Sequence, residues 1–89
     1  MSAMSTRPQT LRTPAQLGLL LQSARKSRGM TQADLAARVR LSQSRISQLE
    51  KDPAELSAER LLAWCSTLGL ELQVARRGET TPEQNTTAW

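Results

Sequence analysis

The stretch MTQADLAARVRLSQSRISQLE, residues 30–50, decides the fold of this chain. Its apolar residues recur at helical spacing in two short stripes. The first stripe is Leu35, Ala36 and Val39, and the second is Ile46 and Leu49. Thr31 and Ser42 stand at the starts of the two segments, where their hydroxyl oxygens can cap helices. The stretch therefore predicts two short helices, 32–39 and 43–51, joined by a tight turn as in a helix-turn-helix.

The second of these helices has a small apolar side, because only Ile46 and Leu49 face inward. Its other side carries residues that form directional hydrogen bonds, namely Gln43, Ser44, Arg45, Ser47 and Gln48. A Gln amide matches the N7/N6 edge of adenine in the major groove, Arg suits guanine or phosphate, and Ser serves either. We therefore predict that this helix contacts DNA bases with these five residues. The alternative interpretation is an ordinary solvated helix face.

Positive charge is concentrated in the half of the chain that contains this motif. Residues 1–51 hold nine Arg and Lys against two acids, a net charge of +7, whereas residues 52–89 carry −3. A basic half suggests a polyanionic partner such as nucleic acid. The cations expected to contact phosphates are Arg25, Lys26, Arg28, Arg40 and Lys51. Surface charges without a partner are the alternative, and the first three also suit the C-terminus of a helix.

One further helix is expected on each side of the motif. The first begins at a Thr13 cap and ends at Gly29, and the last begins at a Ser57 cap and ends at Gly69. Their apolar faces are Leu17, Leu20, Leu21 and Ala24 in the first helix, and Leu61, Leu62, Cys65 and Leu68 in the last. Trp64 falls at the edge of the last of these faces, so we expect it to be partly exposed or at an interface.

The segment after the last helix has the period of a strand. Over residues 70–77, Leu70, Leu72 and Val74 alternate with Glu71, Gln73 and Ala75. A lone strand cannot satisfy its own ladder hydrogen bonds. We therefore predict that it pairs with its copy in a second subunit, with Leu70, Leu72 and Val74 at the dimer interface. The alternative is an extended segment that packs on the last helix. Residues 1–12 are expected to form a disordered arm, and residues 78–89 a flexible tail.

The motif resembles the helix-turn-helix of Cro and phage-repressor regulators. The matching residues are Thr31, Gln32, Leu35, Ala36, Ser42, Ile46, Ser47 and Glu50. The resemblance implies an all-α bundle of four to five helices over residues 13–69. It also implies that Gln32 contacts phosphate and that Gln43, Ser44 and Gln48 face bases. One position departs from the family, because Arg40 stands where a Gly of positive φ is usual, at a cost of about 1 kcal/mol.

The layout of the C-terminal part is similar to that of HipB-type antitoxins. A strand follows the last helix, and a polar tail ends in Trp89. The resemblance implies a homodimer closed by paired strands, repression of its own operon, and binding of a HipA-type serine/threonine kinase toxin. We expect Trp89 to be the residue that docks on this toxin. The alternatives are a stand-alone regulator without a toxin, and a protein-interaction module that neutralises a partner without DNA.

The sequence argues against an enzyme and against a resident metal or cofactor. It has no His, no cluster of metal ligands and no Gly-rich phosphate loop. Cys65, the single cysteine, lies on an apolar helix face, where a buried and inert thiol is expected. No apolar stretch is long enough to span a membrane, and we identify no secretion signal. We therefore expect a cytoplasmic, nucleoid-associated, sequence-specific DNA-binding repressor.

Overall fold

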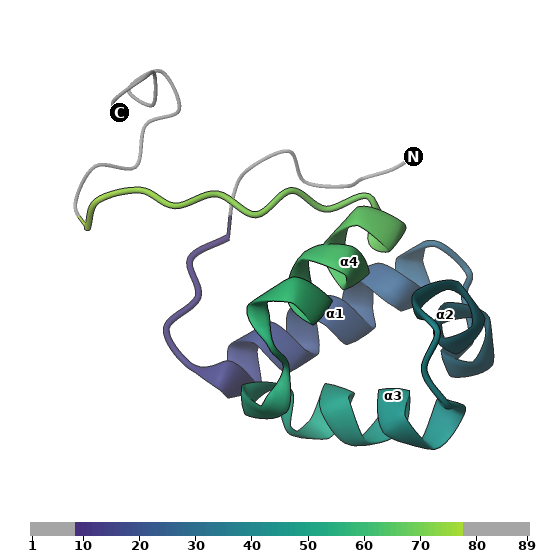
Figure 1. Cartoon of the computed structure of the whole chain (residues 1–89). Coiled ribbons are helices and arrows are strands. Elements are labelled where there is room, and N and C mark those ends of the chain that lie inside the picture. The colour runs from purple at the N-terminus through teal and green to yellow at the C-terminus, as the bar shows by residue number, and fades with distance from the viewer. Residues whose placement is uncertain (1–8, 78–89) are drawn as a thin grey trace.

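The computed structural model describes residues 9–77, and this part of the chain is all-helical. It contains α1 (Pro14–Ser27), α2 (Gln32–Val39), α3 (Gln43–Lys51), the 3-10 turn η1 (Pro53–Glu55) and α4 (Ala58–Leu68). Figure 1 shows α1 and α4 side by side, with α2 and α3 closing the other side of the bundle. The predicted all-α bundle is thereby confirmed for this range. The predicted N-terminal arm up to residue 8 and the predicted tail with Trp89 lie outside the described residues.

Each α-helix begins at the hydroxyl residue expected from the sequence. Thr13 accepts a hydrogen bond from the Gln16 backbone N–H, and Gln16 Oε1 accepts one from the Thr13 N–H, at 3.3 and 3.0 Å. Thr31 and Asp34 form the same reciprocal capping box, at 3.0 and 2.9 Å. Hydrogen bonds from the Thr31 backbone, and next from its side chain, hold the pKa of the exposed Asp34 carboxyl below its usual value. Ser42 and Ser57 cap α3 and α4 through single hydrogen bonds.

The core is formed by aliphatic side chains from all four α-helices around one indole. Its buried apolar residues are Leu21, Leu35, Ala36, Ile46, Leu49, Trp64, Cys65 and Leu68. Two expectations for α4 were wrong, since Trp64 is only 1% exposed and Leu62 is 53% exposed. The inward face of α4 follows positions 61, 64, 65 and 68, the spacing of one helix face, and Leu62 lies about 100° round from Leu61.

A buried polar cluster connects the first three helices. Arg25 Nε and Nη2 donate to the two Glu50 carboxylate oxygens, at 2.7 and 3.2 Å. Arg25 Nη1 donates to the Met30 carbonyl at 2.9 Å, and Gln32 Nε2 donates to Glu50 Oε1 at 3.1 Å. Because both charged groups are paired and hydrogen-bonded, the cluster can remain in the interior. It sets the C-terminal end of α3 relative to α1 and to the start of α2.

Two backbone features allow the helices to meet at these positions. Arg40 ends α2 with φ 64° and ψ 42°, the left-handed conformation expected from the Gly that the family usually has there. The Arg40 and Leu41 N–H groups both donate to the Ala36 carbonyl, which closes the turn. On α1, a Cβ at Gly18 would lie 2.6 Å from the Glu50 carbonyl oxygen, so the close approach of α1 to the end of α3 requires glycine.

Residues 70–77 leave the bundle as an extended segment after α4 (Figure 1). Leu70 packs partly against the core, whereas Leu72 is 46% and Val74 is 82% exposed. Within the described residues, the backbone N–H groups of residues 71–77 donate to no other backbone group, and no strand is formed. The expected pairing needs a second chain and stays a prediction. The alternative interpretation required the segment to pack on α4. Apart from Leu70, its apolar side chains do not pack closely there.

Candidate nucleic-acid interface

One face of α3 packs against the core, and the opposite face is exposed to solvent. At about 100° per residue, its inward positions are those of Ile46, Leu49 and Glu50, all of which are buried. The directly opposite positions belong to Ser44 and Gln48, which are exposed. The helix therefore combines a fixed position with a polar surface turned away from the core, as a groove-reading helix requires.

The other polar residues of α3 flank this outward row on two sides. Gln43, Ser47 and Lys51 follow one another at four-residue spacing along one flank, and Arg45 lies on the other. Ser47 is half-buried and lines a groove between α1, the start of α2 and α3. The full lining is Ala15, Leu19, Gln22, Gln32, Ser47, Glu50 and Lys51. Ser47 therefore lies on the α1 side of the helix rather than on its outermost row.

This groove brings in a polar residue that sequence reasoning missed. Gln22 of α1 lines the same groove as Gln32 and Lys51, so a polyanion along α3 could accept hydrogen bonds from all three helices there. The available signal was weak: Ala15, Leu19 and Gln22 share one face of α1 at four- and three-residue spacing. Only the packing of α1 against α3 places that face next to α3.

Two hydrogen bonds connect the polar side chains near the outward row. Arg45 Nη1 donates to Gln48 Oε1 at 3.1 Å. The Ser42 and Ser44 hydroxyl oxygens lie 3.4 Å apart. Gln43, Ser44 and Gln48 are exposed, and Arg45 is half-buried. Of the five expected base-contacting residues, Ser44 and Gln48 form the outward row, Gln43 and Ser47 lie on one flank, and Arg45 lies on the other.

The expectation that Arg25 contacts phosphate is wrong in this structure. Arg25 is only 6% exposed, and its guanidinium donates to Glu50 and to the Met30 carbonyl. A phosphate cannot approach without breaking this buried ion pair. Arg25 lies one turn from Leu21 on the inward face of α1, whereas Lys26 is exposed in the last turn. The positive charge of Arg25, which the sequence suggested for DNA, therefore pairs with Glu50 inside the protein.

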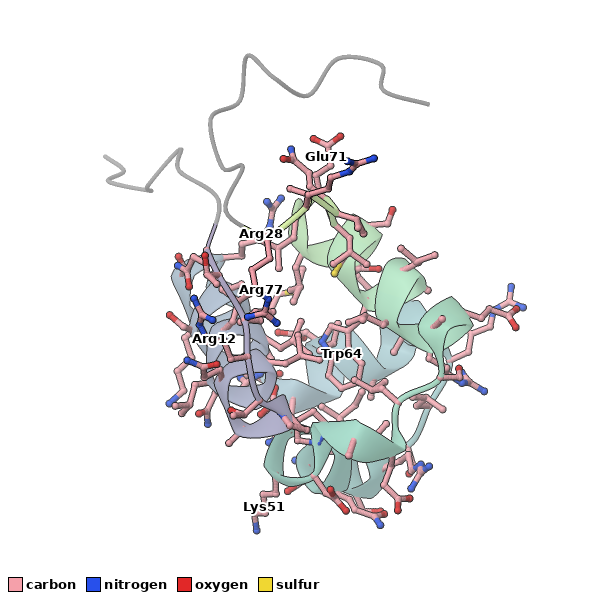
Figure 2. The ribbon with its side chains drawn as sticks, turned by 90° about the vertical axis from the view of Figure 1, so that its left-hand side faces the viewer. Arg12, Arg28, Lys51, Trp64, Glu71 and Arg77 are labelled. Carbon is pink, nitrogen blue, oxygen red and sulfur yellow. The ribbon has the colours of Figure 1, made fainter. Side chains whose placement is uncertain are left out.

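Arg28 also lies away from the reading helix. Its Nη1 donates to the Leu68 carbonyl at the C-terminal end of α4, at 3.4 Å. Figure 2 shows Arg28 in the upper part of the molecule and Lys51 at its lower end. Arg28 is exposed, and its expected contact with phosphate stays a prediction.

Three other expected phosphate contacts, Arg40, Lys51 and Gln32, lie close to α3. Arg40 is exposed in the turn before it, and Lys51 is exposed in its last turn. Gln32 is half-buried, and its amide nitrogen is held by Glu50 at the edge of the groove. Such residues on both ends of a reading helix can grip the phosphates that border a groove. Their contacts with DNA stay predictions.

The described residues contain few features that suggest another kind of site. Burial raises the pKa of the Cys65 thiol, which reduces its reactivity as a nucleophile. No group of three or more possible metal-ligating residues occurs within residues 9–77. In the same range, no helix combines the length and apolar character needed to cross a membrane. The polar surface of α3 is therefore the leading functional candidate.

Comparison with known proteins agrees with this geometry. The family model for the helix-turn-helix matches residues 21–74, more than half of the 89-residue chain. The match covers α2, the turn at Arg40 and all of α3. No curated protein matches the sequence. The chain therefore belongs to the helix-turn-helix family of Cro and phage-repressor type, whose members are DNA-binding regulators of transcription.

Proposed function

We propose that this regulator is a dimeric repressor that reads an inverted-repeat operator with the α3 helices of two copies. The observation that carries the proposal is the division of α3 into an inward face of three buried residues and an outward polar row. Gln43, Ser44 and Gln48 are the expected base readers, with Gln32, Arg40 and Lys51 on phosphates. Lys26 is a further candidate for phosphate because it is exposed.

The extended segment after α4 supports the dimer. Leu72 and Val74 are exposed apolar side chains in alternate positions, beside backbone donors that have no backbone acceptor within the described residues. Antiparallel pairing with a second copy would satisfy these donors and cover both side chains. A small domain also buries only about 60% of the surface of its unfolded chain, so a shared interface adds needed stability.

Selection from a randomised DNA library, followed by footprinting at the selected site, tests this proposal. Two α3 helices related by a two-fold axis enter successive major grooves, so we expect two inverted half-sites about 34 Å apart. Affinity should fall steeply between about 50 and 200 mM salt, because cations on the protein release counterions from the DNA. A single unpaired half-site, or affinity that does not change with salt, contradicts the proposal.

We further propose that the repressor is the antitoxin of a HipA-type serine/threonine kinase. The support is the resemblance of its layout, in which a strand-like segment and a polar tail ending in Trp89 follow the last helix. An aromatic side chain at the end of a tail can anchor an interface, with about 2 kcal/mol or more when fully buried.

Calorimetry with a HipA-type kinase from the same organism tests the antitoxin function. Removal of Trp89 should weaken binding of the kinase while operator affinity of the free protein stays unchanged. Replacement of a polar residue elsewhere in the tail, Gln84→Ala, is the matched control. Equal affinity for the kinase with and without Trp89 contradicts its role as an anchor. Absence of any binding by the full chain favours a stand-alone regulator.

A further inference from the structure

The contact between Arg45 and Gln48 determines what α3 offers to a base. Arg45 Nη1 donates a hydrogen bond of 3.1 Å to Gln48 Oε1 on the exposed surface of the helix. Residues three apart are neighbours on a helix, so the two side chains can keep this contact without distorting the backbone. A guanidinium has donors only, and the amide atom that faces it must therefore be the oxygen. The contact thus fixes which end of the Gln48 amide is free.

The free end of the Gln48 amide is its NH₂ group, a donor. An unconstrained Gln presents one donor and one acceptor side by side, which matches the N7 acceptor and N6 amino donor of adenine. With its oxygen accepting from Arg45, the Gln48 amide presents its NH₂ group to the groove. Guanine offers two adjacent acceptors, N7 and O6, on its major-groove edge. An amide that presents only its NH₂ donors therefore matches guanine better than adenine.

Charge strengthens this preference. The amide oxygen keeps a second lone pair, but an adenine amino group that used it would lie beside the guanidinium N–H groups, with like partial charges together. Within residues 9–77, Arg45 forms no ion pair that would neutralise it. Its positive charge therefore stays beside the amide, where it repels a donor and attracts an acceptor.

We propose that Arg45 is a positioning residue that makes Gln48 select guanine, so that each half-site carries a G·C pair where Gln48 contacts it. The inference rests on the proposed function, since it requires α3 to read bases. It replaces the adenine expected from the Gln side chain alone. It also assigns Arg45 a role through Gln48 rather than as an independent base reader.

Selection of full-length protein variants on a randomised duplex library tests the proposal. Gln48→Ala identifies the base pair at which Gln48 acts, because preference is lost there alone. At that pair, the wild type should favour guanine over adenine by about fivefold or more. Arg45→Met keeps an unbranched side chain about as far as the Arg Nε and removes its donors, and the ratio should fall to about threefold or less, or reverse towards adenine. Arg45→Lys keeps a cationic donor and should retain the guanine preference.

The outcomes separate this inference from the proposed function. If the wild type enriches no sequence, base reading itself fails. If it enriches a motif with adenine or thymine at the pair identified by Gln48→Ala, or if Gln48→Ala changes no position, only the role of the Arg45–Gln48 pair is overturned. An unchanged guanine preference in Arg45→Met also overturns it. Since Arg45 and Gln48 lie at the surface of α3, circular dichroism melts of all variants should match the wild type.

Discussion

Arg40 is held in a left-handed backbone conformation that costs a residue with a Cβ about 1–2 kcal/mol. Glycine removes this strain but gains entropy in the unfolded chain, so Arg40→Gly should raise the free energy of unfolding by about 0.5–1 kcal/mol. The same change should lower DNA affinity and reduce the salt slope by about one unit, because a phosphate contact is lost. Urea denaturation and salt titration of operator binding measure the two effects.

Arg40→Asn is the control for this position, since Asn tolerates the left-handed region and carries no charge. It should lose DNA affinity as much as Arg40→Gly and show intermediate stability. Affinity equal to that of the wild type in both variants would mean that Arg40 contacts no phosphate.

Arg25 and Lys26 are adjacent cations with opposite surroundings. Arg25→Ala leaves the buried Glu50 carboxylate without its partner, which should cost about 3–5 kcal/mol, a large part of the stability of a small domain. The exposed Lys26→Ala should change stability by no more than about 0.5 kcal/mol and should weaken DNA binding if it contacts phosphate. Urea denaturation at neutral pH measures both. Equal stability of Arg25→Ala and the wild type would contradict a structural role for the ion pair.

At the scale of elements, the position of α3 depends on how closely α1 approaches it. A methyl group at Gly18 would lie 2.6 Å from the Glu50 carbonyl oxygen and 3.1 Å from Pro53 Cγ. Gly18→Ala should therefore lower the free energy of unfolding by about 1–3 kcal/mol, although Ala favours a helix by up to about 1 kcal/mol. Ser23→Ala, at an exposed position of the same helix, should be neutral or slightly stabilising. Thermal denaturation of the two variants compares them, and a Gly18→Ala melt at or above that of the wild type refutes the close contact.

At the scale of the whole molecule, residues 70–77 carry the proposed dimer contact. Leu72→Glu or Val74→Glu places a charge on the apolar side of the segment, and either should give monomers that lose operator affinity. Gln73→Glu adds the same charge on the opposite side of an extended chain and should leave the dimer intact. Sedimentation velocity on the full chains measures the oligomeric state. A dimer that survives truncation after Gly69 would show that another surface makes the main contact.

The sequence by itself predicted the helices and the polar outward face of α3. Helix starts depend on one side chain and the backbone three residues on, so Thr13, Thr31 and Ser42 were sufficient to place them. The outward row of α3 followed from its two apolar residues, because periodicity defines the opposite face of a short helix. The left-handed turn at Arg40 was also expected, from the Gly that the resembled family has there.

Only the tertiary structure decided which charged and aromatic residues are buried and which are exposed at the surface. Arg25 and Lys26 are adjacent cations in the last turn of α1, yet only Arg25 is buried, where it pairs with Glu50, 25 residues away in the sequence. The Arg28 side chain donates to the Leu68 carbonyl at the end of α4, and Trp64 rather than Leu62 turns into the core. Burial depends on which helix faces pack together, and that packing depends on contacts between residues far apart in the sequence. A local pattern gives the faces of each helix, but the partners of those faces come only from the folded chain.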